Sequence, residues 1–387
     1  MAMDSETIQM DFYQCGDEAA KLLPVSFDEW ETRAKEILAA APFGYVYGAA
    51  GAGDTHRGNV DAFQKYRIRP RVCCDITKRD LSVSIFGTQF PVPFLLAPIG
   101  VNTILHPDGE LAPAKAAAKC GVPYILSNVS SVSMEQLAKE VGDGVRWFQL
   151  YPPKDHELTK SFLKRAEDSG FKAIVVTVDS TLLGWRETDL RNAYLPFLTG
   201  HGMGNYFSDP IFCSKLREAP DKNVKAAALK ALDEGNNTCF TWKELDFIRE
   251  HTRLPLLIKG ITHPDDAILA LEHGVDGIIV SNHGGRQLDG AVATLDVLPS
   301  ISESIQGKIP IIMDSGIRRG ADVIKAIALG ATAVLLGRPY AYALAVAGET
   351  GVEEVIKHLV AETELQLAIS GRGSIQEVDQ SLIMKVK

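Results

Sequence analysis

The chain has 387 residues, of which 46% are hydrophobic and 23% are charged. These proportions are those of a folded globular protein, so disordered, collagen-like and disulfide-knot chains are excluded. The 40 basic and 49 acidic residues give a formal net charge of −9, which disfavours binding to nucleic acid or to an anionic membrane surface. No run of about 18 apolar residues occurs, so we expect no membrane-spanning segment.

The six cysteines lie at positions 15, 73, 74, 120, 213 and 239. None belongs to a Cys-x-x-Cys pair or to a zinc-finger spacing, so we expect no bound metal. The adjacent Cys73 and Cys74 are poorly placed to form a disulfide with each other. This pattern favours free thiols in a reducing, cytoplasmic compartment.

Residues 1–93 precede the first of the apolar runs described next, and we expect them to form an N-terminal helical extension that caps the rest of the chain. From residue 94 onward, eight apolar runs alternate with amphipathic segments. Continuous apolarity, without polar alternation, is typical of parallel strands that are buried on both faces. The runs are Phe94–Gly100, Tyr124–Asn128, Arg146–Tyr151, Ala173–Asp179, Pro255–Gly260, Gly277–Asn282, Pro310–Gly316 and Ala333–Arg338.

These runs begin 22 to 33 residues apart, except for one interval of 82. Eight strands at the spacing of βαβ units predict a (β/α)8 TIM barrel over residues 94–387, with a doubly wound open sheet as the alternative. The long interval places an insert, residues 180–240, after the fourth strand, and inserts of this length are usually lids. A C-terminal helix is expected over residues 352–369, packed against the barrel or a neighbouring molecule.

Polar or flexible residues end each apolar run. In a barrel the carboxyl ends of the strands meet at the face where active sites lie, so we expect these residues to converge there. A buried lysine such as Lys259 is costly unless it faces an anion, although a lysine that reaches solvent is the alternative. The strand-end residues are Pro98, Ile99, Gly100, Ser127, Gln149, Tyr151, Thr177, Asp179, Lys259, Ser281 and Asp314.

The most specific pattern follows the sixth run, where residues 281–289 read SNHGGRQLD. His283 stands three residues before Arg286 on a glycine-rich turn, which would place a base and a cation over one pocket. The alternative is that His283 caps the next helix. Arg186 lies near the start of the insert, and two arginines can hold one carboxylate through paired N–H donors. A surface salt bridge is the alternative for Arg186.

Glycines and arginines also follow the last two runs, as Gly316 with Arg318 and as Gly337 with Arg338. Barrels commonly hold a phosphate group at this place, with backbone N–H groups and a helix N-terminus as donors. A glycine turn alone is common, but two such turns with arginines predict a phosphate-binding end of the site.

Five short motifs together resemble those of the FMN-dependent α-hydroxy acid oxidase/dehydrogenase family. They are SNHGGRQLD at 281–289, TVDS and GWR within 177–186, LIKG at 257–260 and DSGIRRG at 314–320. The resemblance extends from Phe27 to Gly371 and implies a (β/α)8 barrel that binds FMN. It implies a base at His283, an orienting carboxylate at Asp179, a tyrosine near the substrate hydroxyl at Tyr151, and carboxylate-holding groups at Arg186, Arg286 and Tyr47.

The resemblance also places the flavin. It implies that Lys259 lies beside flavin N1 and the C2 carbonyl. The residues that it places along the isoalloxazine and ribityl chain are Pro98, Ile99, Gly100, Ser127, Gln149, Thr177, Lys259 and Ser281. Those that it places at the ribityl–phosphate end are Asp314, Gly316, Arg318, Gly337 and Arg338.

The implied reaction is oxidation of a small L-2-hydroxy acid by FMN and O2, with His283 taking either the hydroxyl proton or the Cα proton. Within the family, the chain resembles the lactate 2-monooxygenase branch at Gly100, at the triplet 184–186 and at the insert segments 195–199 and 205–212. Enzymes of that branch convert L-lactate and O2 into acetate, CO2 and water. The alternative is an oxidase that releases a 2-oxo acid and hydrogen peroxide.

The family resemblance also implies a homo-oligomer, a tetramer or an octamer. Two other classes stay open at this point. The first is a phosphate-binding barrel with isomerase or nucleotide-dehydrogenase chemistry, which predicts no use for His283, Arg286 and Arg186 as a set. The second is a catalytically silent binding scaffold, which should have lost at least one of His283, Lys259 and Arg286.

Overall fold

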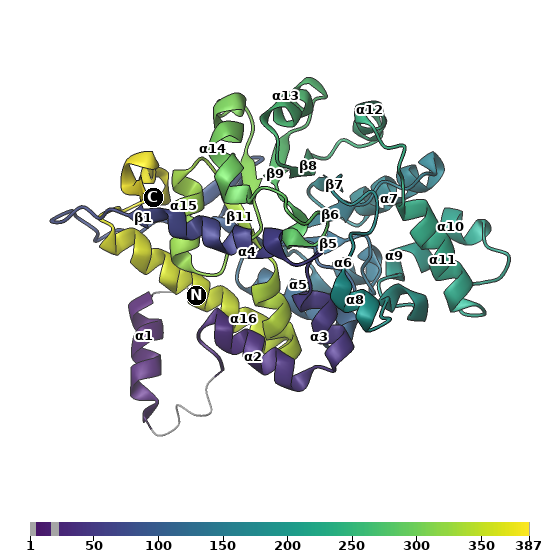
Figure 1. Cartoon of the computed structure of the whole chain (residues 1–387), viewed down its shortest axis with the longest axis horizontal. Helices are drawn as coiled ribbons and strands as arrows, with labels where there is room; N and C mark the ends of the chain where they lie inside the picture. The colour runs from purple at the N-terminus through teal and green to yellow at the C-terminus, as the bar shows by residue number, and fades with distance from the viewer. Residues whose placement is uncertain (1–4, 17–22, 387) are drawn as a thin grey trace.

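The computed structural model describes residues 5–16 and 23–386. Eight parallel strands close into a barrel, in which β4 pairs with both β5 and β11, and helices surround it (Figure 1). Each predicted apolar run supplies one strand, so the (β/α)8 barrel is confirmed and the open sheet is excluded. The strands are β4 Phe94–Leu96, β5 Tyr124–Ser127, β6 Arg146–Leu150, β7 Ile174–Thr177, β8 Leu256–Ile261, β9 Gly277–Val280, β10 Ile311–Met313 and β11 Ala333–Leu336.

Every residue of β4, β5, β7, β9, β10 and β11 is buried. This explains why these strands show continuous apolarity: one face fills the barrel interior and the other meets the surrounding helices. The crossover helices are α5 Leu111–Lys119, α6 Met134–Val141, α7 His156–Asp168, α12 Trp242–Glu250, α13 Pro264–Glu272, α14 Thr294–Ile305 and α15 Gly320–Ala328.

The last helix, α16 Arg338–Ile369, begins directly after β11 and is much longer than the predicted segment 352–369. It bends at Ala347 and Gly348, whose backbone angles are not helical. Because Gly348 has a φ of 57°, a conformation that glycine adopts without strain, the sequence there resembles a helix end. Helix α16 packs against α2, α5 and α15.

The N-terminal extension contains the helices α1 Ser5–Gln14, α2 Phe27–Ile37, α3 Ala40–Tyr47 and α4 Asp54–Asp61. It is not wholly helical, in contrast to the prediction. Strands β2 Val83–Ile85 and β3 Thr88–Phe90 form a hairpin, and Phe86 at its turn packs against Trp147 with ring centroids 5.7 Å apart. Strand β1 Tyr66–Ile68 pairs antiparallel with β12 Ile383–Lys385.

The insert after β7 folds into short helices rather than a loop: α8 Glu187–Arg191, the 3-10 turn Pro196–Thr199, α9 Gly204–Phe207, α10 Pro210–Ser214 and α11 Val224–Gly235. They gather at one end of the molecule, on the right in Figure 1. Asp209 anchors them: it is fully buried, accepts from the N–H groups of Ile211 and Phe212, and pairs with Arg165 of α7 at 2.9 Å.

Within residues 5–16 and 23–386, no helix combines the length and the apolarity needed to cross a bilayer.

Candidate active site

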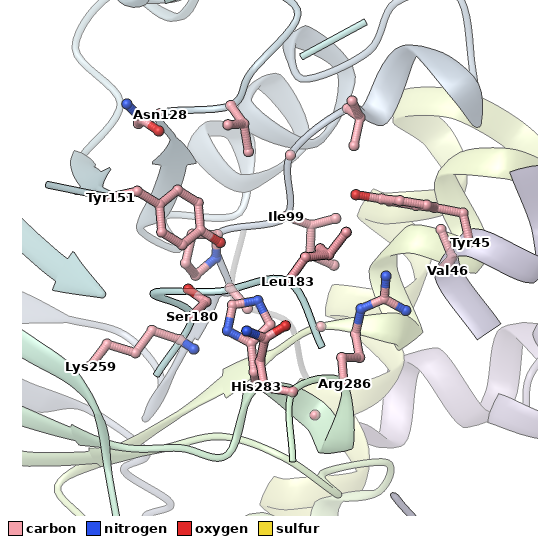
Figure 2. A pocket seen from close by; sticks show the side chains of 18 of the residues that line it. Tyr45, Val46, Ile99, Asn128, Tyr151, Ser180, Leu183, Lys259, His283 and Arg286 are labelled. Atoms are coloured by element: carbon pink, nitrogen blue, oxygen red, sulfur yellow. The ribbon is translucent and has the colours of Figure 1, made fainter. Parts of the chain in front are cut away.

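A cavity of about 340 Å³ opens among the carboxyl ends of the strands and is partly covered by the insert. Figure 2 shows His283, Lys259, Tyr151 and Arg286 around this cavity, although they come from widely separated parts of the chain. The structure therefore brings together most of the residues that the sequence predicted. Those that line the cavity are Pro98, Ile99, Gly100, Tyr151, Arg186, Lys259, His283, Arg286, Asp314, Gly316, Arg318, Gly337 and Arg338.

His283 and Asp179 form a pair at the edge of the cavity, with 2.9 Å between the imidazole Nδ1 and the carboxylate Oδ1. Asp179 approaches closely because Gly260, at an irregularity of β8, has no side chain: a Cβ there would lie 2.6 Å from the Asp179 Cβ. With Nδ1–H donating to the carboxylate, Nε2 is left as a proton acceptor. This is the arrangement of a base that a carboxylate orients.

The turn that carries His283 has an unusual backbone. His283, Gly284 and Gly285 all have positive φ, at 58°, 66° and 75°. A non-glycine residue in this region is strained, and such strain persists where the surroundings impose it. Here the Ser281 hydroxyl accepts from the His283 N–H at 3.1 Å, and Asn282 accepts from the Gly285 N–H at 3.1 Å. The turn is thus fixed, and with it the direction of the imidazole.

The environment sets the charges of this pair. Burial lowers the pKa of His283 below its ordinary value, although the Asp179 carboxylate partly opposes this change. Burial alone would raise the pKa of Asp179, but the nearby His283 and Lys259 hold it below its ordinary value. At neutral pH the pair therefore consists of a carboxylate and a neutral imidazole that is ready to accept a proton.

Arg186 and Arg286 bring two positive charges to one side of the cavity. Arg186 is buried and donates from Nε to the Arg286 carbonyl at 3.1 Å and from Nη2 to the Gln287 Oε1 at 2.8 Å. Arg286 donates to the Gly48 carbonyl at 2.8 Å and lies over the Tyr45 ring, 5.1 Å from its centroid. Burial and the Arg186 charge lower the pKa of Arg286. Such a site favours an anion that neutralises both guanidiniums.

Tyr47 is not among the residues that line the cavity, in contrast to the prediction. It is 46% exposed, and its ring stacks on Phe43 with centroids 5.3 Å apart. Tyr45, which lines the cavity, takes the expected place. Both lie on helix α3, where a step of two residues rotates a side chain by roughly 200°, so Tyr45 and Tyr47 point in nearly opposite directions.

Tyr151 lies just beyond the end of β6, and its ring is 6.5 Å from that of His283. Burial raises the pKa of Tyr151 to about 12, against the opposing effect of the Lys259 charge. The phenol therefore stays protonated and can donate a hydrogen bond to a ligand oxygen beside the imidazole.

Lys259 is buried and has two partners: its Nζ lies 2.8 Å from the Ser281 hydroxyl and 3.3 Å from the Asp314 carboxylate. Burial alone would lower the pKa of Lys259, but Asp314 and Asp179 raise it above its ordinary value. Lys259 is therefore a charged ammonium group facing the cavity, as predicted, rather than a lysine that reaches solvent.

The edge of the cavity floor carries polar atoms without partners. Ser127 donates to the Gln149 Oε1 at 2.8 Å, but the Gln149 Nε2 and the Thr177 Oγ1 are buried and have no partner among the described residues. Buried polar atoms are rarely left unpaired. The Gln149 amide nitrogen, the Thr177 hydroxyl and the Lys259 ammonium are hydrogen-bonding groups that fit the carbonyl and N–H groups along one edge of a flavin ring. Among the predicted residues, Ser127, Gln149, Thr177, Asp179 and Ser281 do not line the open cavity itself, and Thr177 borders a separate small pocket beside Tyr151.

The loop Pro98–Gly100 forms another wall, and Ile99 offers it an apolar surface (Figure 2). Gly100 is required by close packing: a Cβ there would lie 2.5 Å from the Val129 carbonyl oxygen, which accepts from the Val101 N–H at 3.0 Å. The loop after β4 is thereby fixed to the loop after β5.

At the end of the cavity formed by β10 and β11, the buried Arg338 and the partly buried Arg318 meet the N-terminus of α16. Arg318 lies over the Phe27 ring at 4.3 Å, and burial with the Arg338 charge lowers its pKa. Arg338 donates to the carbonyls of Val46, Gly48 and Gly284, which leaves two of its N–H groups available. Two cations and a helix N-terminus fit a phosphate group.

Sequence reasoning missed several cavity residues. Asn128 and Tyr206 are buried and line the cavity, as do apolar residues of the insert. The pattern of apolar runs carries no information on how the insert folds back over the barrel mouth. Asn128 ends the second apolar run and so belongs to the polar strand-end residues expected at this face, but no role was assigned to it.

Known proteins are similar to this chain in sequence and in fold. The FMN-dependent dehydrogenase family matches residues 34–385. The chain is 43% identical to L-lactate oxidase from Lysinibacillus sphaericus, over 94% of this chain and 93% of the relative. It is 42% identical to peroxisomal (S)-2-hydroxyacid oxidase GLO3 from Arabidopsis thaliana, over 92% and 95%. The solved structure of mandelate oxidase matches with a TM-score of 0.82 and 36% identity, over 92% of this chain and 97% of that one.

These similarities cover nearly the whole chain, including the strand ends that form the cavity. They exclude the isomerase, the nucleotide dehydrogenase and the silent scaffold as descriptions of this barrel. The chain belongs to the FMN-dependent dehydrogenase family and is an FMN-dependent 2-hydroxy acid oxidoreductase.

Proposed function

We propose that this enzyme is a lactate 2-monooxygenase, which converts L-lactate and O2 into acetate, CO2 and water. The observation that supports this proposal is the attachment of the insert over the cavity. Segment 201–205 is hydrogen-bonded to the loops after β4 and β5, which themselves border the cavity. A lid held in this way slows product release, and pyruvate that stays in the site can react with hydrogen peroxide before either leaves.

The residues of the cavity support oxidation at the 2-position. We infer that Arg186 and Arg286 hold the substrate carboxylate, while the His283 Nε2 accepts a proton from the substrate and Asp179 stabilises the resulting imidazolium. Tyr151 donates to the substrate hydroxyl oxygen. The carboxylate and the hydroxyl together fix the carbon that loses its hydrogen. FMN supplies the electron acceptor, which O2 then reoxidises, and the Lys259 ammonium offsets negative charge near the ring.

The lid attachment consists of a chain of side-chain hydroxyls. The Ser131 Oγ accepts from the Gly202 N–H at 2.8 Å and lies 2.6 Å from the Thr103 Oγ1. Thr103 in turn lies 2.7 Å from the His201 Nδ1. Asn205 adds a further bond from its amide to the Asn128 carbonyl at 3.1 Å. The insert is therefore joined to the barrel beside the loops after β4 and β5, which border the cavity.

A second candidate is an L-lactate oxidase, which releases pyruvate and hydrogen peroxide. The relative from Lysinibacillus sphaericus bears that name. One part of the cavity wall also supports it: Leu182 and Leu183 line the cavity and are nevertheless 61% and 57% exposed. A mouth that is open at these leucines would let pyruvate escape before it reacts.

Product analysis distinguishes the two candidates. With L-lactate and O2, we expect the wild-type enzyme to form acetate and CO2 in equal amounts, measured by chromatography and by trapping of CO2. If each mole of lactate consumed instead yields one mole of pyruvate and one mole of hydrogen peroxide, the monooxygenase proposal is contradicted and the enzyme is an oxidase.

The lid attachment leads to a specific prediction. In Thr103→Val the hydroxyl between Ser131 and His201 is lost while the shape of the side chain is kept. Because one hydrogen bond contributes about 1 kcal/mol, we expect the pyruvate fraction of the product to rise roughly fivefold. Thr199→Val is the matched control, because the Thr199 hydroxyl donates to the Pro196 carbonyl within the insert and has no other partner among the described residues. An unchanged product ratio in Thr103→Val would refute the role of this attachment.

The pH dependence of the reductive step follows from the lowered pKa of His283. Burial lowers this pKa below 6.5, and a base must be neutral to accept a proton. We therefore expect the rate of flavin reduction by L-lactate to be flat through neutral pH and to fall only in acid, with a midpoint below 6.5. Stopped-flow reduction at a series of pH values measures this midpoint, and a midpoint at or above 6.5 would contradict the assignment.

Compartment and assembly belong to the same proposal. We infer a cytoplasmic enzyme, which the six free cysteines support, and a homo-oligomer of four or eight subunits. Light scattering on the purified protein measures the mass, and a monomeric mass would exclude the oligomer.

A further inference from the structure

Helix α2 of the N-terminal extension lies behind the two arginines at the phosphate end of the site. It packs along α16 (Figure 1), whose first residue is Arg338. The Arg318 guanidinium lies over the ring of Phe27, the first residue of α2, with 4.3 Å between the guanidinium carbon and the ring centroid. Neither Phe27 nor Glu31, four residues further along α2, lines the cavity. Helix α2 therefore supports the arginines and is not part of the surface that a ligand touches.

The start of α2 is itself fixed. The Ser26 Oγ accepts from the Glu29 N–H at 3.3 Å, and the Glu29 carboxylate accepts from the Ser26 N–H at 2.9 Å. Trp30 is 2% exposed and anchors the helix in the core. Because residues four apart lie on the same side of a helix, Phe27 and Glu31 are presented together.

The charges at this end of the site explain why such support is needed. Burial and the Arg338 charge lower the pKa of Arg318 to about 10, and burial lowers the pKa of Arg338. The Glu31 carboxylate opposes this change at both guanidiniums. The Tyr342 ring, with its centroid 5.7 Å from that of Phe27, completes the cluster. Helix α2 thus supplies an aromatic face and a negative charge to two cations that repel each other.

The remaining contacts of the Arg318 side chain are local. Its Nη1 donates to the carbonyl of the preceding residue, Ile317, at 2.9 Å. The next residue, Arg319, lies 3.8 Å from the Asp28 carboxylate of α2. A long side chain that is ordered only when its ligand arrives reduces the affinity, because its loss of rotamer freedom opposes binding. Contact with Phe27 orders the Arg318 guanidinium beforehand.

We propose that helix α2 preorganises the phosphate subsite: Phe27 and Glu31 are positioning residues that hold Arg318 and Arg338 in place while no phosphate is bound. Phe27 offers its ring face to the Arg318 guanidinium, and Glu31 offsets the repulsion between the two cations. Bound FMN takes over the second task, because its phosphate brings the compensating charge. The proposal concerns cofactor binding and does not depend on which acid is oxidised or which product is formed.

The first test compares FMN with riboflavin, which has the same ring and ribityl chain but no phosphate. The full-length protein is freed of flavin and titrated with each compound, and the quenching of flavin fluorescence gives the two Kd values. In Phe27→Leu we expect the Kd of FMN to rise about tenfold, because a desolvated cation–π contact is lost, and the Kd of riboflavin to stay unchanged. Phe27→Tyr keeps the ring face and should restore the wild-type ratio of the two constants.

Phe247→Leu is the matched control for this ratio. Phe247 also makes a cation–π contact, with the Lys160 ammonium at 5.6 Å from its centroid, but it does not line the cavity. Its ratio of Kd values should equal that of the wild type. A substitution that only loosened the fold would weaken FMN and riboflavin alike, so the ratio separates a positioning role from a merely structural one.

Glu31→Gln tests the charge while the shape is kept. In the flavin-free protein the two cations then repel each other without compensation, whereas in the FMN complex the phosphate compensates them. We therefore expect the Tm of the flavin-free protein to fall and the Tm of the FMN complex to stay at the wild-type value, so that FMN raises the Tm by more than in the wild type. Circular dichroism measures both values. Glu36→Gln, an exposed position on the same helix, should change neither.

Three results would overturn the proposal. The first is a ratio of Kd values in Phe27→Leu that stays at the wild-type value. The second is Glu31→Gln with an equal change, or no change, in the Tm of both forms. The third is a wild-type protein that binds riboflavin as tightly as FMN, because the phosphate subsite would then contribute nothing. If Phe27→Leu does not fold, Glu31→Gln and the wild-type ratio decide.

Discussion

His283→Ala is expected to keep its FMN but to lose the reaction with substrate: the rate of flavin reduction by L-lactate should fall by about 10³-fold or more. The imidazole touches neither the phosphate end nor the predicted flavin edge, so cofactor binding should survive. Its loss removes the base that the Asp179 carboxylate orients toward the cavity, and a positioned base contributes roughly 10² to 10⁴ in rate. Anaerobic stopped-flow absorbance measures the reduction.

A matched control exists elsewhere in the molecule. His273 also pairs with a carboxylate, Asp246, at 2.6 Å, but it does not line the cavity. His273→Ala should therefore reduce its flavin at the wild-type rate. Wild-type reduction in His283→Ala would show that another group takes the proton, and the mechanism proposed above would fail at its first step.

Arg286→Lys should raise the KM for L-lactate and lower kcat/KM by about 100-fold. Lysine keeps the charge but cannot donate two parallel hydrogen bonds to a carboxylate while also holding the Gly48 carbonyl, and such a replacement is not conservative at a paired site. The neighbouring Arg186, which is itself buried, would then bind the substrate carboxylate alone. Steady-state kinetics on the purified variant measure both constants.

Lactamide, an uncharged analogue of lactate, tests whether the effect of Arg286→Lys depends on the substrate carboxylate. The preference for lactate over lactamide, as a ratio of kcat/KM values, should fall in Arg286→Lys, since only lactate uses the second guanidinium. Arg372→Lys serves as the control, because Arg372 also donates to a backbone carbonyl but lies outside the cavity lining. A KM for lactate that stays at the wild-type value in Arg286→Lys would exclude the two-arginine site.

The barrel could be predicted from the sequence because its strands are buried on both faces. A run such as Ile174–Thr177 shows no polar alternation, and eight runs of this kind at the spacing of βαβ units are typical of a closed parallel barrel. The convergence of the strand-end residues at one face could also be predicted, because parallel strands in a closed barrel bring their carboxyl ends to the same face. His283 and Lys259 could therefore be placed in one site from their positions alone.

Features that depend on local helix geometry or on long-range packing could not be predicted in this way. Tyr47 and Tyr45 are two residues apart, and only the phase of helix α3 decides which one faces Arg286. The placement of Tyr206 depends on how the insert folds, and the anchor at Asp209 is a contact with a distant helix. The hairpin of β2 and β3 was hidden because each strand has only three residues.

The pairing of β1 with β12 has a consequence for how the protein is made. Strand β12 is translated after all eight barrel strands, yet it is the partner that holds β1, just ahead of the barrel in the sequence. The pairing with β1 can therefore form only after residues 383–385 have been synthesised, later than every strand of the barrel. This two-stranded sheet thus ties the segment before the barrel to the segment after it, and it is a late contact in any folding that accompanies synthesis.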